Sequence, residues 1–469
     1  MAKQLEEPEA QPKQLEESGP ETQRSALAEE KQEFARPALR SSKLTLAVRA
    51  LRHRNFQLFF AGQLISLIGT WMQTVAQSWL VYRMTGSALL LGTVGFASQI
   101  PVFIMAPVGG IVADRHRRQR VVIGTQTASM LLAFILAFLT LTGRVQVWQI
   151  MVLAAGLGVV NAFDIPARQA FLIDMVGRED LLNAIALNSS MFNGARIIGP
   201  AIAGILVASI GEGWCFFANA VSYIAVIIGL LLMRIQHAAN PAHHGSPLEN
   251  IIEGFGFARR TVPMRAILLL LGLVSFVGMP YAVLMPVFAD QILHGGARGL
   301  GILMGATGVG ALLGAASLAA RVGVKGLSKL IAICAAGFGV SLILFASSRI
   351  FWLSTVLLLP VGFSMMVQMA SSNTLIQAMT PDHLRGRIMS VYSMMFMGLA
   401  PFGALSAGVV AHHVGAPWTV ALGGVACIAG SVLFGMHLPR IRARAHELVV
   451  AQGMTAGAPA QGATTGGLS

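Results

Sequence analysis

The sequence predicts an all-α membrane protein of twelve transmembrane helices, arranged as two pseudo-symmetric bundles of six. The prediction follows from the composition, from long blocks without charge and from an internal repeat. Of the 469 residues, 55% are hydrophobic and 11% are charged, whereas about a quarter of a soluble domain is charged. Several blocks without Asp, Glu, Lys or Arg reach the ~20 residues that a helix needs to cross a bilayer. They are Phe56–Tyr82, Met84–Ala113, Val121–Gly143, Gly213–Met233, Ala266–Ala289 and Gly299–Ala320.

Apolar length and the polar connections place the twelve spans in order. The first six are expected at residues 56–82, 88–113, 120–142, 146–172, 184–209 and 214–234. The second six are expected at 264–290, 298–321, 327–347, 351–379, 384–411 and 418–438. The expected division of the chain is therefore a tail (1–48), a first bundle (49–235), a linker (236–262), a second bundle (263–440) and a second tail (441–469).

The polar segments outside the spans have distinct compositions. Residues 1–48 are rich in Glu, Gln, Pro, Ser and Ala, and cannot bury enough apolar area to fold, so we expect a disordered cytoplasmic tail. The linker contains Pro241 and Pro247, and its end, Glu249–Arg260, is amphipathic enough to lie along the cytoplasmic interface. The end of the chain beyond Ala451 is rich in Gly, Ala and Thr, and is also expected to be disordered.

The net charge of +13 could suggest a nucleic-acid partner, but the distribution of the basic residues argues against one. Arg115, Arg117, Arg118 and Arg120 crowd one connection between spans, and Arg144 stands alone in the next. Other connections continue this alternation. It is typical of the positive-inside rule, which places the basic connections and both termini in the cytoplasm. We therefore expect a lipid bilayer around the protein and no nucleic-acid partner.

An internal repeat supports two related halves. A shift of 204 residues superimposes one serine, four glycines and a tryptophan on the same residue types. The pairs are Ser189/Ser393, Gly194/Gly398, Gly199/Gly403, Gly204/Gly408, Gly211/Gly415 and Trp214/Trp418. Duplicated halves joined by a linker predict a substrate path at the pseudo-symmetric interface near the middle of the membrane.

No catalytic, metal or cofactor motif stands out. Cys215, Cys334 and Cys427 are dispersed in apolar blocks and are interpreted as small buried hydrophobic residues. No histidine pair has a carboxylate or cysteine cluster near it in the sequence. A phosphate-binding glycine loop followed by Lys and Ser or Thr is missing, which argues against ATP as the energy source. We expect no enzyme activity and no cofactor.

The sharpest local signal follows the second span. The segment Gly110–Arg120 reads Gly-Ile-Val-Ala-Asp-Arg-His-Arg-Arg-Gln-Arg, with Asp114 where the helix meets the cytosol. Gly109 and Gly110 would let another helix approach closely, and Asp114 could pair with a basic residue of the other half. This segment resembles the signature loop of the major facilitator superfamily, although Arg117 replaces the glycine usual between the arginines. Alone, the segment could also be only a topology anchor.

Two further segments carry a more specific resemblance. Asn161–Gln169 contains Asp-Ile-Pro-Ala-Arg-Gln, and Asn193–Gly204 contains Asn-Gly-Ala-Arg-Ile-Ile-Gly-Pro-Ala-Ile-Ala-Gly. Both are similar to the facilitator branch that includes bacterial enterobactin and macrolide exporters, and the resemblance covers about residues 50–440. It implies the facilitator fold in a cell (inner) membrane, alternating access between two states, and proton-coupled export of a small amphiphilic molecule by a monomer. An importer or lipid flippase of the same fold, and a membrane sensor or scaffold without transport, remain as alternatives.

Charged residues inside the spans are functional candidates, because such residues are costly there. Asp164 and Arg168 are four residues apart and share a helix face, so they can pair. Asp164 has two possible roles: a gate partner for Arg115 or Arg118, which its depth favours, or the carboxylate that carries the coupled proton. Arg385 and Arg387, before the eleventh span, are expected to meet Asp114 and its arginines when the cytoplasmic side closes.

The fifth span carries a second set of candidates. Arg196 could hold an anionic substrate group, neutralise a buried carboxylate, or pair only with carbonyls at a helix end. Gly199, Pro200 and Gly204 resemble the fifth-helix motif that is linked with antiport, but could also serve packing alone. The sequence lacks the arginine that many drug/proton antiporters of the superfamily carry early in the fourth span.

Polar and thioether side chains on the first and tenth spans are the candidates for a substrate cavity. A methionine-rich surface adapts to varied hydrophobic ligands, but such side chains also face lipid or pack in cores. Gln and Ser side chains could instead bond neighbouring helices. The cavity candidates are Gln63, Gln73, Gln77, Gln368, Met369 and Asn373.

Overall fold

The charge-free blocks form helices because lipid offers no partner for a free backbone amide or carbonyl group. The structure, a computed structural model, describes residues 49–234, 247–321 and 323–451. Within these ranges it has twelve helices that are long and apolar enough to cross a membrane. The first six are α3 (Arg54–Thr85), α4 (Ala88–Arg115), α5 (Arg118–Leu141), α6 (Val147–Val176), α7 (Leu181–Ile210) and α8 (Glu212–Leu231).

The remaining six spans follow the linker. Four of them are single helices: α12 (Gly296–Ala319), α13 (Leu327–Ser347), α14 (Phe351–Met379) and α17 (Ala416–Met436). The other two, residues 262–292 and 382–414, are built from several shorter segments. The predicted ends of all twelve spans differ from the observed ends by at most four residues. The expected twelve-helix architecture is confirmed.

The seventh and eleventh spans are interrupted where the prediction had continuous helices. The seventh comprises α10 (Val262–Leu273), η2 (Val274–Gly278), η3 (Met279–Ala282), α11 (Met285–Val287) and η4 (Phe288–Ile292). The eleventh comprises η5 (Asp382–Leu384), α15 (Arg385–Ser393), η6 (Met394–Gly398) and α16 (Ala400–Val414). Pro280, Pro286 and Pro401 fall at the interruptions, where proline removes a backbone donor and bends the helix. π-helical segments such as η2 and η6 often mark functional positions.

Shorter helices flank the spans. η1 (Arg49–Arg52) precedes α3, and α9 (Pro247–Arg260) forms the end of the linker. α18 (Leu438–Ala451) crosses the boundary that we expected at residue 440. Its Ile441 and Ala445 are buried at helical spacing while Arg442 and Arg444 are exposed, so one face covers the bundle. The expected tail 1–48, the linker residues 236–246 and the C-terminal residues 452–469 lie outside the described residues.

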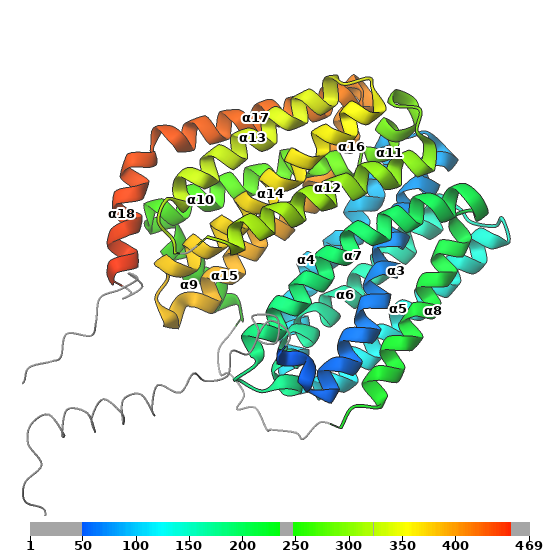
Figure 1. Ribbon diagram of the computed structural model, residues 1–469, viewed down its shortest axis with the longest axis horizontal. Coiled ribbons are helices and arrows are strands. Elements are labelled where there is room, and N and C mark those ends of the chain that lie inside the picture. The colour runs from blue at the N-terminus through cyan, green and yellow to red at the C-terminus, as the bar shows by residue number, and fades with distance from the viewer. Residues whose placement is uncertain (1–48, 235–246, 322, 452–469) are drawn as a thin grey trace, which may run out of the picture. The chain divides into compact units, whose positions relative to one another are not determined.

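The spans pack as two groups in chain order. In the first group, α3 packs on α7 and α8, α4 on α6, and α5 on α6 and α8 (Figure 1). In the second group, α12 and α13 both pack on α14, and α13 packs on α17. The main contacts between the groups are α7 with α12 and α4 with α16, and they join the described residues from Ala50 onward into one compact unit.

The internal repeat has a backbone counterpart. Gly211 links α7 to α8 with φ 90° and ψ 169°, and Gly415 links α16 to α17 with φ 86° and ψ 156°. Both angles lie in a region that only glycine adopts readily. Because fifth and eleventh spans are equivalent in the repeat, the α7–α12 and α4–α16 contacts are also equivalent. The two halves are therefore pseudo-symmetric.

Candidate functional site

The fifth-helix glycines form the contact between α7 and α12. A Cβ added to Gly204 would lie 3.1 Å from Gly301 Cα, and a Cβ added to Gly301 would lie 2.5 Å from Pro200 O. Farther along the same crossing, a Cβ on Gly308 would lie 3.2 Å from Arg196 O. Glycine permits this approach because it has no side chain between the backbones. Gly199 serves a different contact, since its Cβ would lie 2.5 Å from Trp71 Cβ on α3.

The equivalent contact joins α4 to α16. A Cβ on Gly92 would lie 2.5 Å from Ala404 O, and a Cβ on Gly408 would lie 2.9 Å from Gly92 Cα. Nearby, the ring of Phe103 lies against Gly398, where a Cβ would come within 2.5 Å of the ring. The two crossings thus use glycine in the same way on both sides of the pseudo-symmetry.

Both crossings lie away from the basic connections. Gly92 is near the start of α4, and Arg115 ends that helix. α7 begins at Leu181, at the basic end of the bundle where α4 ends. Gly204 is near the other end of α7. At the basic end, Asp114, Arg115 and Arg117 are exposed. The two halves therefore touch in the part of the membrane opposite to the basic connections.

The first half of α7 exposes polar side chains beside apolar ones such as Leu182 and Phe192, which are 82% and 44% exposed. Ser189 and Ser190 are exposed, and Asn193 is partly exposed. Among the described residues, the side chains of Ser190 and Asn193 bond only within the helix: Ser190 Oγ donates to Ala186 O at 2.9 Å and Asn193 Nδ2 donates to Ser189 O at 2.9 Å. A polar face of this kind suits contact with water or a ligand.

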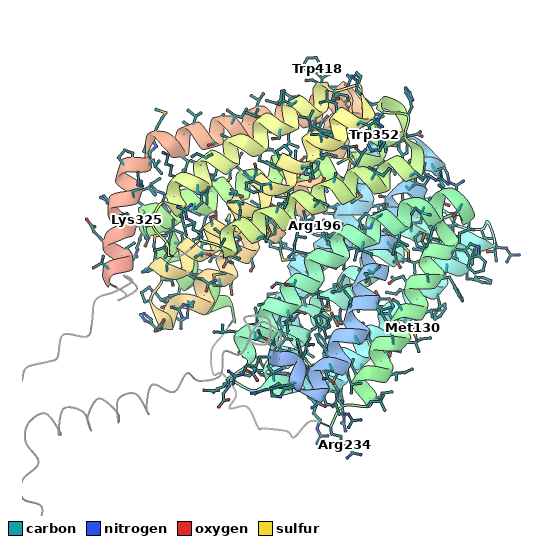
Figure 2. All side chains as sticks on the ribbon, viewed as in Figure 1. Met130, Arg196, Arg234, Lys325, Trp352 and Trp418 are labelled. Atoms are coloured by element: carbon teal, nitrogen blue, oxygen red, sulfur yellow. The ribbon has the colours of Figure 1, made fainter. Side chains whose placement is uncertain are left out.

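Arg196 ends this polar face, at the middle of α7, where the two groups of helices meet (Figure 2). Its side chain is partly exposed, and within the described ranges no hydrogen bond or ion pair involves its guanidinium group. Tyr281 of η3, in the other half, lies close enough to Arg196 to interact with it electrostatically. A guanidinium group carries five donors and binds carboxylate or phosphate in a bidentate manner. Arg196 is thus a cation without a counter-ion in the part of the chain that the structure describes.

The carboxylates Asp164 and Glu212 of the first half are paired with other residues. Asp164 is 4% exposed; its Oδ1 accepts from Thr125 Oγ1 at 2.8 Å and from Gln126 Nε2 at 2.9 Å. Its Oδ2 lies 3.2 Å from Arg168 Nε, so the predicted pair four residues apart is confirmed. Glu212 pairs with Arg83 at 2.7 Å. Asp164 therefore ties α5 to α6, and does not contact Arg115 or Arg118, the partners that we considered.

Three of the expected gate residues, Arg118, Arg385 and Arg387, are in separate ion pairs. Arg118 Nη1 lies 3.1 Å from Asp174 Oδ1 and also donates to Ala170 O at 3.0 Å. Arg385 pairs with Asp382 at 2.6 Å, and Arg387 pairs with Glu253 of α9. No ion pair of Asp114 occurs among the residues that the structure describes. The gate contact between Asp114 and these arginines stays a prediction for the state closed at the basic end.

Gly110 does not have the close helix neighbour that we expected. A Cβ on Gly110 would meet nothing within 4 Å, whereas a Cβ on Gly109 would lie 1.9 Å from Ala162 O on α6. The two glycines lie on different faces of α4 because successive helical residues are about 100° apart. Gly109 therefore makes the close approach within the half.

The cavity candidates have different environments. Gln73 is 7% exposed and accepts from Asn219 Nδ2 at 2.7 Å, so it bonds α3 to α8. Gln63 and Gln368 are buried, and Gln63 Oε1 and Gln368 Nε2 have no hydrogen-bond partner among the described residues. Gln77, Met369 and Asn373 are partly exposed. For Gln73 the packing interpretation fits the geometry better than the cavity interpretation.

Several contributing residues were absent from the sequence prediction. They are Gly92 and Gly301 at the crossings, and Asp174, Glu253 and Asp382 as ion-pair partners. The high glycine content indicates that helices approach each other closely, but nothing in the sequence identifies which glycine contacts which helix. Gly408 appeared in the repeat without an assigned contact.

Comparisons with known proteins agree with this architecture. A family model described as a transmembrane secretion effector matches residues 45–456. The chain is 26% identical to the staphyloferrin A transporter of Staphylococcus aureus, over 80% of this chain and 94% of that protein. It is 28% identical to the multidrug efflux pump Tap of Mycolicibacterium fortuitum (80% and 93% covered) and 26% identical to the enterobactin exporter EntS of Shigella boydii (73% and 81% covered).

Solved structures show the same fold. The crystal structure of a bacterial homologue of the iron transporter ferroportin, in an inward-facing state, superimposes with a TM-score of 0.62 at 16% identity. The superposition covers 83% of this chain and 98% of that one. The twelve spans form two pseudo-symmetric bundles, and the family model matches nearly the whole chain. The chain is a multi-pass membrane transporter that belongs to the transmembrane secretion effector family of the major facilitator superfamily.

Proposed function

We propose that this transporter exports small amphiphilic molecules that carry an anionic group, and that Arg196 binds that group midway across the membrane. The observation that carries the proposal is the position of Arg196 between the halves, without a counter-ion among the described residues. An unpaired cation inside a membrane span is costly, so such a residue is interpreted as a binding group for an anion that binds and dissociates. A substrate carboxylate or similar oxyanion would make bidentate bonds to it.

The names of the relatives support this substrate class. Two of them carry the names of siderophores, staphyloferrin A and enterobactin, and a third is named as a multidrug efflux pump. A siderophore presents oxygen donors that bind ferric iron, and these donors also suit a guanidinium group. Partly exposed Met369 and exposed Met394 and Met397 would contact the apolar part of the molecule.

The charge distribution supports an orientation of the protein in the membrane. Under the positive-inside rule, the connection with Arg115, Arg117 and Arg120 is cytoplasmic, as are both termini. The glycine crossings then close the outer side, and the polar face of α7 faces the cytoplasm. A state open to the cytoplasm is the one in which an exporter would load its substrate.

Alternating access would reverse this arrangement. Opening the α7–α12 and α4–α16 crossings would expose Arg196 to the outside, and closing the basic end would bring Asp114 toward Arg385 and Arg387. Proton antiport would supply the energy. Asp164 is the candidate carrier, and it would have to release the bonds from Thr125, Gln126 and Arg168 when it takes up a proton.

Transport into inside-out vesicles tests the proposal. Vesicles that contain the protein should accumulate an anionic siderophore when their interior is acidified, and accumulate a neutral analogue of similar size much less. Arg196→Gln should weaken the apparent affinity for the anion by at least about tenfold, because a desolvated charge pair is lost. Arg196→Lys should retain part of it. Ser209→Ala, on the same helix but bonded only to its own backbone, is the matched control.

Three outcomes would count against the proposal. If Arg196→Gln and the wild type transport the anionic and the neutral analogue equally well, Arg196 does not bind the anionic group. Accumulation only in right-side-out vesicles would indicate an importer. No transport of any compound by purified protein in liposomes would favour a sensor or scaffold.

A further inference from the structure

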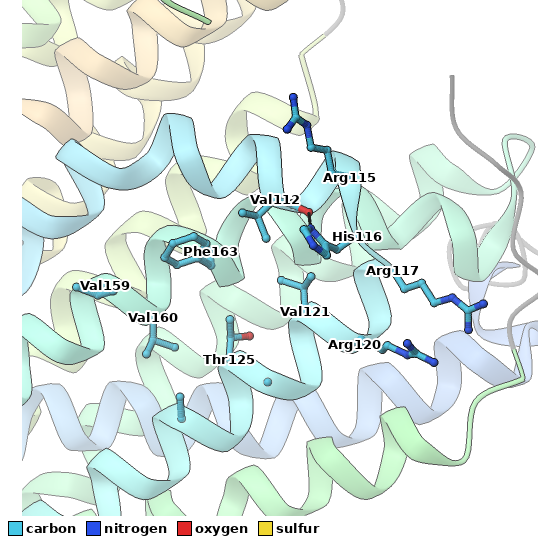
Figure 3. A pocket seen from close by; sticks show the side chains of 12 residues that line it. Val112, Arg115, His116, Arg117, Arg120, Val121, Thr125, Val159, Val160 and Phe163 are labelled. Carbon is cyan, nitrogen blue, oxygen red and sulfur yellow. Dashed lines mark hydrogen bonds between the residues drawn. The ribbon is translucent and has the colours of Figure 1, made fainter. Parts of the chain in front are cut away.

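A groove separate from the glycine crossings lies where α4, α5 and α6 converge at the basic end (Figure 3). Its volume is about 640 Å³. The wall is apolar and includes Val112 of α4, Val121 of α5, and Val160 and Phe163 of α6. Thr125 contributes a hydroxyl that is already bonded to Asp164. The wall of the groove is thus an apolar surface, and it is not a polar ligand site; we call it the apolar bed.

The groove continues into helix faces that are exposed and apolar. On α5, Gly124 in the groove is followed at helical spacing by Leu131 and Phe138, which are 54% and 61% exposed. On α4, Ile104 is 65% exposed, and Val112 lies two turns farther along the same face. On α6, Val152 is 61% exposed and precedes the groove residue Val159 at helical spacing. In a membrane such faces contact acyl chains, so the groove opens to lipid.

The rim of the groove at the basic end is strongly cationic. Arg115, Arg117 and Arg120 line it together with His116, and the three arginines are exposed. Within the described ranges none of these arginines has an ion pair, whereas the neighbouring Arg118 is occupied by Asp174. The first turn of α5 starts at the same place, and its N-cap residue Arg117 provides no side-chain cap. Free amide groups there add to the positive potential.

We propose that this groove binds one anionic phospholipid of the adjoining leaflet. One acyl chain would lie against Val112, Val160 and Phe163, and the phosphate group would be bound by the arginines of the rim. The apolar bed, its continuity with lipid-facing stripes and the unpaired arginines at headgroup depth all favour this occupant. Basic pockets between transmembrane helices on the cytoplasmic side are suited to anionic headgroups.

Native mass spectrometry of the full-length protein tests the proposal. Phosphatidylglycerol should remain bound after phosphatidylcholine of the same chain length has dissociated. Changing Arg115, Arg117 and Arg120 together to Gln should weaken phosphatidylglycerol binding by roughly a hundredfold, since each basic residue near an anionic headgroup adds about fivefold. Changing the exposed Arg260, Arg442 and Arg444 to Gln removes the same charge elsewhere and should leave binding unchanged.

A second variant tests the acyl-chain bed without changing charge. A Cβ on Gly124 would meet nothing within 4 Å, so Gly124→Leu is accommodated by the fold and fills the groove. It should lower phosphatidylglycerol retention by at least about fivefold. Gly435→Leu is the control, because a Cβ on Gly435 also meets nothing within 4 Å and lies on α17, outside the groove.

Other occupants would give different results. Equal retention of the two lipids, or full retention in the triple arginine variant, would overturn the proposal. Displacement of the lipid by inorganic phosphate together with full retention in Gly124→Leu would indicate a simple anion site, which also overturns it. Residues 1–48 contain nine glutamates. If lipid binds only after these glutamates are changed to Gln, the acidic segment is the native occupant of the groove. The lipid proposal is then wrong.

Discussion

Gly92 of α4 and Gly408 of α16 pack directly against each other: a Cβ on either one would lie 2.9 Å from the Cα of the other. Gly204 and Gly301 have the equivalent relationship at the α7–α12 crossing. These pairs join the two halves at the end of the membrane opposite to the basic connections. A transporter that alternates between two states must open both crossings, and glycine allows two backbones to part and meet again without side-chain rearrangement.

Gly92→Val should therefore weaken the α4–α16 crossing. The added side chain would overlap Ala404 O and Gly408, which costs about 1–3 kcal/mol and shifts the population of this state by roughly five- to hundredfold. The reporter is a cysteine at Ala404, which is 1% exposed; the three native cysteines are buried and should react slowly. Ala404→Cys should react with a maleimide several-fold faster in the Gly92→Val background.

The control for this experiment is Gly194→Val, at a position where a Cβ meets nothing within 4 Å. It should leave the labelling rate unchanged. If Gly92→Val also has no effect on labelling, the glycine crossing is not the contact that closes this side.

Asp164→Asn should destabilise the first half. It keeps the shape of the side chain but removes the charge that pairs with Arg168, in a site that is 4% exposed. Loss of one partner of a buried ion pair costs about 3–5 kcal/mol. Thermal unfolding of the purified protein, with and without the change, measures this loss.

Asp174→Asn is the matched comparison, because the side chain of Asp174 is 31% exposed and pairs with Arg118. Its effect should be about 0–1 kcal/mol. Equal effects of the two variants would contradict the structural role of Asp164. If Asp164→Asn folds and its export still responds to the pH gradient, another group carries the proton.

Gln73 and Asn373 should respond differently to replacement by Leu. Gln73→Leu removes the acceptor of the buried Asn219 Nδ2, so the melting temperature should fall while the apparent affinity for substrate stays unchanged. Asn373 is partly exposed and accepts from Gln377 Nε2 in the next turn of the same helix, so Asn373→Leu should change apparent affinity with little effect on melting. If Gln73→Leu instead lowers the apparent affinity and leaves the melting temperature unchanged, Gln73 is a residue of the substrate cavity.

The sequence predicts the spans well because the insertion of a segment into the membrane depends on the composition of that segment itself. Twenty apolar residues must form a helix in lipid, whatever their neighbours, so the ends of α3 or α14 follow from composition alone. The glycine at 211 and its repeat at 415 are also local signals. The breaks in the seventh and eleventh spans could have been inferred from Pro280, Pro286 and Pro401, which were not given weight.

The pairings between helices were less predictable. Arg118 could reach several carboxylates by sequence alone, and the choice of Asp174 depends on how α5 packs on α6. Likewise, Gly109 and Gly110 are equivalent in a pattern, and only the rotation of α4 decides which one meets α6. Asp164 with Arg168 was predictable because a spacing of four residues fixes their proximity within one helix.

The most direct test of alternating access is a pair of distance measurements by electron paramagnetic resonance. One spin-label pair, at Arg178→Cys and His383→Cys, spans the basic end, and the other, at Arg144→Cys and His413→Cys, spans the opposite end; all four positions are exposed. Adding substrate or changing the pH should shift the balance between the two conformational states. One distance should then shorten while the other lengthens. Two distances that stay fixed under every condition while export proceeds would contradict the account.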